Sequence, residues 1–200
     1  MNFLAHIALS GPEPEIQIGN FLGDFVRGTI EHPRNAFLSP TMKVGAKLHR
    51  LIDSFTDSHP VVRQSIDRLQ PRYHKYAGIV VDVYYDHFLA KSWQQFGTDE
   101  PLEEYARHFY TILHKAQPSL PRSFDNLIKS ISTQDWLSNY AHLDGIEWAL
   151  KGISRRTEHV SGIENAIEEL RDNFELFEQE FLVFYPQVRQ MCQTFINEVM

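Results

Sequence analysis

The stretch AGIVVDVYYDHFLAKSWQQF, residues 77–96, decides the fold class of this chain. A spacing of i, i+3, i+4 and i+7 predicts a helix here, and the spaced positions are Val80, Val83, Tyr84, His87, Phe88 and Lys91. Gly97 would end that helix. Asp82 and Asp86 stand four residues apart in this apolar setting, where an acid is costly unless it is paired or binds a metal.

Helical patterns continue on both sides of this stretch, and no strand alternation of useful length accompanies them. Ser39-Pro40-Thr41 supplies helix-start chemistry, and apolar residues then recur at helical spacing as far as Phe55. Pro101 would open a helix that runs to about residue 116. Other helices are predicted at residues 2–9, 124–131, 133–140, 143–154 and 158–181, with a last one from Pro186. Because no repeat or flexible linker is present, we expect one all-α domain, a helical bundle over residues 1–200.

Composition and charge exclude several classes of protein. The chain has 200 residues, 42% of them hydrophobic, which suffices for one domain with a core. A net charge of −7 disfavours non-specific nucleic-acid binding, which needs a basic surface. The N-terminus lacks a basic region and no stretch approaches the ~20 apolar residues of a membrane helix, so we expect neither a signal peptide nor a membrane span. Cys192 is the only cysteine, which fits a reducing compartment, and the cytoplasm is the expected location.

The segment from Gly19 to Gly28 is the first that could carry chemistry. If it is helical, Asn20, Asp24 and Arg27 share one face at i, i+4 and i+7. A carboxylate between an amide and a guanidinium could bind a metal or a phosphate, because Arg can fork onto phosphate oxygens. The alternative is a helix surface with an ordinary Asp–Arg pair.

Two further polar sets have helical spacing. His49 and Asp53 stand at i, i+4, which lets two side chains hold one cation, although such a pair is also common on helix surfaces. Asp82 and Asp86 repeat this spacing, and His87 points about 100° away from Asp86 around the helix. Each set by itself is weak evidence for a site.

A helical bundle can join such sets into one metal site, because side chains on facing helices project into its interior. Mixed carboxylate and imidazole ligands suit Mn²⁺, Fe²⁺ or Zn²⁺, with Mg²⁺ possible if carboxylates dominate. Such an ion would polarise a phosphoryl oxygen and activate a bound water. His6, on a short apolar helix, is either a hydrogen-bonded core histidine or a ligand or ligand support.

The same residues resemble the motifs of a known family, acyl carrier protein phosphodiesterase. The similar segments are Met1-Asn2-Phe3-Leu4-Ala5-His6, Gly19-Asn20 with Asp24-Phe25-Val26-Arg27-Gly28, His49-Arg50 with Asp53, Asp82 with Asp86-His87-Phe88-Leu89, and Phe184-Tyr185-Pro186. The resemblance covers nearly the whole chain. It implies an HD-domain-like α-helical fold, with Mn²⁺ as the favoured ion. It also implies hydrolysis of the phosphodiester that joins 4′-phosphopantetheine to a serine of holo acyl carrier protein, which leaves the apo carrier protein.

The resemblance also implies roles for individual residues. The expected metal ligands, for one ion or two, are Asp24, His49, Asp53, Asp86 and His87, with His6 as a further ligand or support. The expected catalytic residues are Arg27, Arg50, Asn20 and Asp82, of which the two arginines would neutralise the phosphodiester. The order Asp86-His87 is the reverse of the His-Asp order of ordinary HD enzymes.

A basic segment offers a surface for the carrier protein, which is small and acidic. Residues 34–75 hold eight bases and three acids. The candidate contacts are Lys43, Lys47, Arg63, Arg68 and Arg72. The alternative is a scattered, solvated set of charges. Residues 164–180, with seven acids and one base, have the pattern of a solvated helix face.

Two other functions stay open at this point. An HD-type phosphohydrolase that acts on a nucleotide or another small phosphoester would need no docking surface. A non-catalytic module would bind the carrier protein without cutting it. A purely structural helical protein would leave the acids of residues 82 and 86 unexplained.

Overall fold

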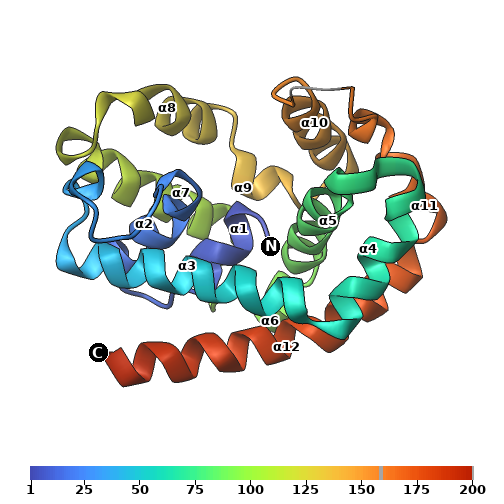
Figure 1. Cartoon of the computed structure of the whole chain (residues 1–200), viewed down its shortest axis with the longest axis horizontal. Coiled ribbons are helices and arrows are strands. Elements are labelled where there is room, and N and C mark those ends of the chain that lie inside the picture. Colours follow the sequence, from blue (N-terminus) through green and yellow to red (C-terminus); the bar gives the residue numbers. More distant parts are fainter. Residues whose placement is uncertain (158–159, 200) are drawn as a thin grey trace.

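The computed structural model describes residues 1–157 and 160–199, and within them the chain forms helices and loops without a strand (Figure 1). The all-α prediction is therefore confirmed. The α-helices are α1 (Phe3–Ala8), α2 (Pro14–Phe21), α3 (Pro40–Ser58), α4 (Pro60–Tyr73), α5 (Ala77–Lys91), α6 (Trp93–Phe96), α7 (Leu102–Ala116), α8 (Asp125–Thr133), α9 (Trp136–Asn139), α10 (Leu143–Ser154), α11 (Ile167–Asp172) and α12 (Phe174–Val199). Short 3₁₀ turns are η1 (Gly23–Phe25), η2 (Pro33–Asn35), η3 (His74–Tyr76), η4 (Gln117–Ser119), η5 (Arg122–Phe124) and η6 (Ile163–Asn165).

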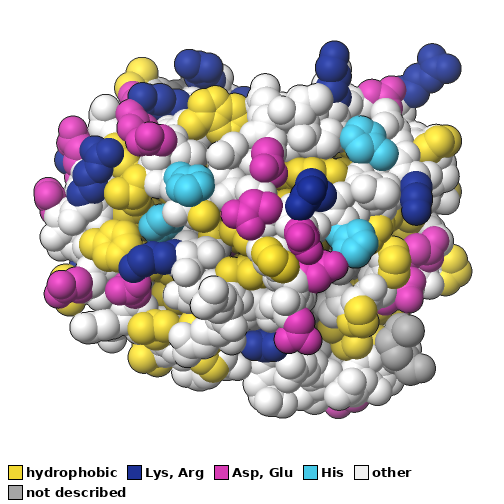
Figure 2. Space-filling view, turned by 180° about the vertical axis from the view of Figure 1, so that it is seen from behind, with side chains coloured by type: hydrophobic (Ala, Val, Ile, Leu, Met, Phe, Trp, Pro, Cys, Tyr) yellow, Lys and Arg dark blue, Asp and Glu magenta, His cyan; other side chains and the backbone are white. Residues whose placement is uncertain are grey.

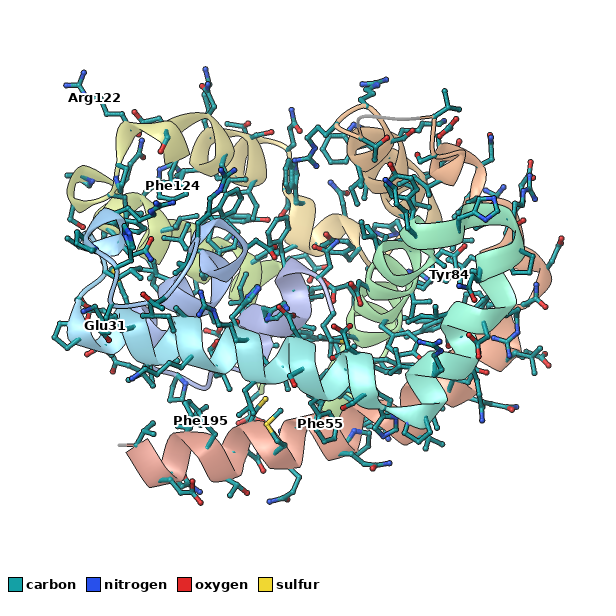
Figure 3. All side chains as sticks on the ribbon, in the orientation of Figure 1. Glu31, Phe55, Tyr84, Arg122, Phe124 and Phe195 are labelled. Atoms are coloured by element: carbon teal, nitrogen blue, oxygen red, sulfur yellow. The ribbon has the colours of Figure 1, made fainter. Side chains whose placement is uncertain are left out.

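Helix α5 lies in the core, as its sequence predicts. It is apolar around most of its girth, and a helix of that kind is stable only when other elements surround it. Its neighbours include α1, α4, α10 and α12. Tyr84 shows the packing, because its ring meets the edge of Phe177 with centroids 5.1 Å apart and its hydroxyl donates to the carbonyl of Ala166 (Figure 3).

Two glycines let α2 and α3 cross with their backbones in contact. A Cβ atom on Gly19 would lie 2.0 Å from the carbonyl oxygen of Met42, and one on Gly45 would lie 2.2 Å from that of Ile16. No larger residue fits at either position without moving a helix. The crossing brings the C-terminal end of α2 against α3, and the candidate site lies next to it.

The C-terminal part differs from the prediction. We expected a helix over residues 158–181 and a new one from Pro186; instead the chain forms η6, α11 and α12, and α12 continues through Pro186. The predicted start at residue 158 lies outside the described residues. A proline inside a helix loses one hydrogen bond, but buried side chains on both sides of it, among them Phe184 and Val188, hold α12 against the core. Phe55 of α3 packs on Phe184, with ring centroids 6.1 Å apart (Figure 3).

None of the helices in the described part of the chain, α12 included, combines the length and the apolar composition needed to cross a membrane.

Candidate metal centre

Three side chains from two helices meet at one point. His6 of α1 and His49 and Asp53 of α3 each place one ligand atom within 4.8 Å of the others. Nε2 of His49 lies 3.2 Å from Oδ2 of Asp53, and Nε2 of His6 lies 3.3 Å from Oδ1 of the same carboxylate. Asp24 of η1 joins them, with its Oδ1 3.3 Å from Nε2 of His49. Two imidazoles and one or two carboxylates form a donor set that suits a divalent transition metal.

Asn20 determines which ring nitrogen of each histidine faces this point. Its side-chain amide donates to the carbonyl of His6 and to Oγ of Ser10, so its Oδ1 is an acceptor, and Nδ1 of His6 lies 2.8 Å from it. The backbone carbonyl of Asn20 lies 2.8 Å from Nδ1 of His49. Because both acceptors require an N–H, each Nδ1 carries the proton. Each Nε2 of a neutral ring is then a lone pair that points at the cluster, as metal-ligating histidines require.

Gly23 gives the ring of His49 its space. A Cβ atom at this position would lie 2.1 Å from Cγ and 2.4 Å from Nδ1 of His49. The ring therefore packs directly on the backbone of η1, which also carries Asp24. Sequence reasoning missed Gly23 as a site residue, and only the close approach reveals it.

The carboxylates and histidines shift the pKa values of one another. Burial works to lower the pKa of His49, but hydrogen bonds to Asp24 and Asp53 outweigh it and raise that pKa to about 9. Burial lowers the pKa of His6. The hydrogen bond to His49 lowers the pKa of Asp24, while hydrogen bonds from both histidines outweigh burial and lower that of Asp53. The cluster without metal therefore holds two carboxylates, one imidazolium and one neutral imidazole.

Asp86, an expected ligand, has another set of partners. It is fully buried, and its carboxylate accepts the backbone N–H groups of Asn2 (3.0 Å) and Leu4 (2.8 Å) at the start of α1. Burial raises its pKa to about 7, although these amides and the charged Met1 amine work against that shift. Asp86 thus fixes the orientation of α1, the helix that presents His6. The acid that looked costly in the apolar stretch is satisfied by backbone donors.

His87 and Asp82 also lie outside the His6–His49–Asp53 group. Nδ1 of His87 lies 2.7 Å from the carbonyl of Tyr140 and so ties α5 to the end of α9. Oδ1 of Asp82 accepts the amino group of Met1 at 2.6 Å. Asp82 nevertheless lines the cavity that contains Asp24, as described below.

Among the described residues, the two expected arginines form no hydrogen bond or ion pair with the cluster. The segment 19–28 is not one helix, because α2 ends at Phe21 and the backbone then forms η1 and a loop. The condition for Asn20, Asp24 and Arg27 to share a helix face is therefore not met. Arg27 is exposed on that loop. Arg50 donates to the loop carbonyls of Val26 (3.1 Å) and Gly28 (2.6 Å), so it secures the segment that follows Asp24.

Four of the five bases expected to contact the carrier protein are already paired with acids. These pairs are Lys43–Glu31, Arg63–Asp67, Arg68–Glu180 and Arg72–Glu169. Glu31 lies beside the first turns of α3 (Figure 3). In the described part of the chain Lys47 has no ion pair, and Figure 2 shows basic and acidic side chains interspersed over one face of the molecule. This pairing reduces the positive charge that the segment offers to a partner.

A cavity of about 860 Å³ opens at the cluster. Asp24, Asp53 and Asp82 line it on the side of η1, α3 and α5. The other wall consists of residues of α8, α9 and α10, and Arg155 and Arg156 lie at the end of α10. Both arginines are exposed and neither forms an ion pair within residues 1–157 and 160–199.

Comparison with known proteins points to one family. Residues 1–188 match the family Acyl carrier protein phosphodiesterase. The acyl carrier protein phosphodiesterase of Enterobacter sp. (strain 638) is 33% identical over 189 residues, which is 94% of this chain and 95% of the relative. The proteins of that name from Yersinia enterocolitica and Escherichia coli are 31% and 32% identical, each over 96% of this chain and over 98% and 97% of the relative. No solved structure matches this chain.

Proposed function

Since the chain belongs to the acyl carrier protein phosphodiesterase family, we propose that it hydrolyses the phosphodiester between 4′-phosphopantetheine and a serine of holo acyl carrier protein. Water adds to phosphorus, the bond from phosphorus to the serine oxygen breaks, and that oxygen takes up a proton. The products are the apo carrier protein and 4′-phosphopantetheine. The cytoplasm is the compartment we propose for the reaction, in line with the sequence-based expectation.

The observation that carries this proposal is the arrangement of two histidines around one carboxylate. The two oxygens of Asp53 each face the Nε2 atom of a different histidine, and Asn20 holds the opposite nitrogen of each ring. The donor set fits a divalent cation, and we propose Mn²⁺, with Mg²⁺, Fe²⁺ and Zn²⁺ as alternatives. When bound, such an ion polarises a phosphoryl oxygen and lowers the pKa of a coordinated water.

The surrounding residues hold this arrangement in place. We assign His6, His49, Asp53 and Asp24 as the ligands, because these four converge in the structure. Their supports are Asn20, which orients both rings, and Asp86, which fixes α1. His87 and Arg50 stabilise the segments around the site rather than touching the substrate.

We propose that the acidic carrier protein docks on a basic surface. Arg155 and Arg156 line the cavity and form no ion pair with the described residues, whereas Arg68 and Arg72 are engaged with acids of α12 and α11. We assign docking to Arg155 and Arg156, with Lys47 of α3 as a further contact. Complementary charge would steer the acidic partner toward the cavity.

The direct test is mass spectrometry of holo acyl carrier protein after incubation with the protein and Mn²⁺, with an EDTA control. We expect the carrier to lose the mass of phosphopantetheine only when metal is present. Turnover of free nucleotides without any cleavage of the carrier would instead support a small-phosphoester hydrolase. Binding of the carrier without mass loss, with several metals tried, would support a binding module.

A further inference from the structure

The cavity next to the metal centre has two walls of different chemistry. The wall that contains Asp24 and Asp53 is acidic and adjoins the histidines. Beyond these carboxylates the cavity extends to α8, α9 and α10, and with about 860 Å³ it exceeds what a phosphate group alone would occupy. A ligand whose phosphate lies at the metal centre would therefore have further groups in contact with the second wall.

Large apolar side chains are exposed on this cavity. Phe25, Ile79 and Trp148 are 41%, 40% and 45% exposed, and all three line it. Trp136 lies between Phe3 and Trp148, with ring centroids 6.0 Å and 5.6 Å away. Single exposed apolar residues are common on protein surfaces. Several of them grouped in one cavity are typical of a binding site.

Side-chain amides accompany the apolar residues. Asn126 of α8 and Asn139 of α9 both line the cavity. Asn139 uses its Nδ2 to donate to the carbonyl of Gln134 at 2.8 Å, which leaves its Oδ1 available as an acceptor. The side chain of Asn126 makes no hydrogen bond within the described residues and can both donate and accept. Such groups suit a ligand with amide bonds of its own.

We infer that this cavity binds the pantetheine arm and that Trp148 is the side chain that recognises it. The inference rests on the proposed function, because the phosphate end of the arm would lie at the metal centre. In the pantetheine arm, a carbon with two methyl groups follows the CH₂ that bears the phosphate. Two amides lie further along the arm, and a thiol is at its end. Methyl groups match the Trp136–Trp148 wall, and the amides match Asn126 and Asn139.

The test compares Trp148→Ala with Leu176→Ala. Leu176 is a matched control, since it is 48% exposed and does not line the cavity. We expect Trp148→Ala to raise KM for holo acyl carrier protein about tenfold, the size of one lost apolar contact. Mn²⁺ binding, followed by electron paramagnetic resonance, should stay unchanged in both variants. The control should keep the wild-type KM.

A second measurement uses pantetheine itself as the probe. Its addition should change the intrinsic fluorescence of the wild-type protein with Mn²⁺ bound, and Trp148→Ala should reduce that change to the part that Trp136 of the same wall contributes. Trp93 is buried and bonded to the carbonyl of Glu100, so it contributes little to the response. An unchanged KM together with no fluorescence response would overturn the inference while cleavage by the wild type still supports the proposed function. Failure of the wild type to cleave the carrier protein would contradict both the proposed function and this inference.

Discussion

The rings of His6 and His49 stack with their centroids 4.0 Å apart and an interplanar angle of 20°. Two stacked imidazoles that point their Nε2 atoms at one carboxylate cannot both be protonated without strong repulsion. The arrangement suits two neutral rings that share a cation, and the burial of His6 already lowers its pKa. The relationship between these two residues is therefore compatible with a divalent cation held by both rings.

Asn20→Ala should weaken metal binding about 10- to 100-fold, because neither the orientation nor the tautomer of His6 would then be fixed by the side chain. Gln17→Ala is the matched control, since Gln17 is also a buried amide of α2 and donates to the carbonyl of Gly11 at 2.8 Å. Both variants should lose stability, and only Asn20→Ala should lose metal. Calorimetric titration with Mn²⁺ measures the difference. Equal affinities in the two variants would remove Asn20 from the site.

Metal affinity should rise with pH. The raised pKa of His49, about 9, means that this ring is protonated in the metal-free protein at pH 7, and a metal must displace the proton. His6 has a lowered pKa and releases none. The apparent affinity should therefore rise about tenfold per pH unit up to about pH 9 and then level off. Calorimetry in two buffers of different ionisation enthalpy counts the protons; a count of zero at pH 7 would contradict this assignment.

Gly23→Ala should abolish metal binding with little loss of helix content. The new Cβ atom would meet the ring of His49 at 2.1 Å, so the ring must leave its place above η1. Gly78→Ala is the control, because its Cβ atom would only touch Ile66 at 4.0 Å. Circular dichroism and Mn²⁺ titration check both variants. Normal metal affinity in Gly23→Ala would show that η1 can move aside without cost to the site.

Asp53→Ala and Asp86→Ala should have different effects. Asp53 is a proposed ligand, so its removal should abolish metal binding and turnover while the protein stays folded. Asp86 holds the amides of α1, so its removal should lower the free energy of unfolding by about 1–3 kcal/mol and weaken metal binding only through His6. Thermal unfolding and metal titration separate the two. Complete loss of metal with full stability in Asp86→Ala would make Asp86 a ligand after all.

Reversal of charge at the end of α10 should weaken docking. The double variant Arg155→Glu and Arg156→Glu should raise KM for the carrier protein at low salt, with a smaller effect as salt increases. Its kcat should change little. Arg122→Glu is the control, because Arg122 points away from the body of the molecule (Figure 3). Steady-state kinetics at two ionic strengths provide the measurement, and equal effects in both variants would place docking elsewhere.

Local spacing in the sequence predicted much of the fold and part of the site. The core position of α5 and the bounds of α10 follow from apolar periodicity, which depends only on neighbours along the chain. The proximity of His49 and Asp53 also follows from local spacing, since residues four apart on a helix lie on one face. His6 was left with two interpretations, because one histidine on a short helix has no local partner to decide between them.

Only the tertiary structure decided which of the polar residues meet. The crossing of α2 and α3 at Gly19 and Gly45 places Asn20 beside His49, 29 positions further along the chain, and the packing of α1 on α2 places Asn20 beside His6. Asp86 looked like a ligand because a buried acid needs a partner, and the partner proved to be the backbone of α1. The sequence by itself thus determined most of the helices and their chemical groups. Their long-range packing decided which groups form the candidate metal centre, because burial and close approach bring together segments that lie far apart along the chain.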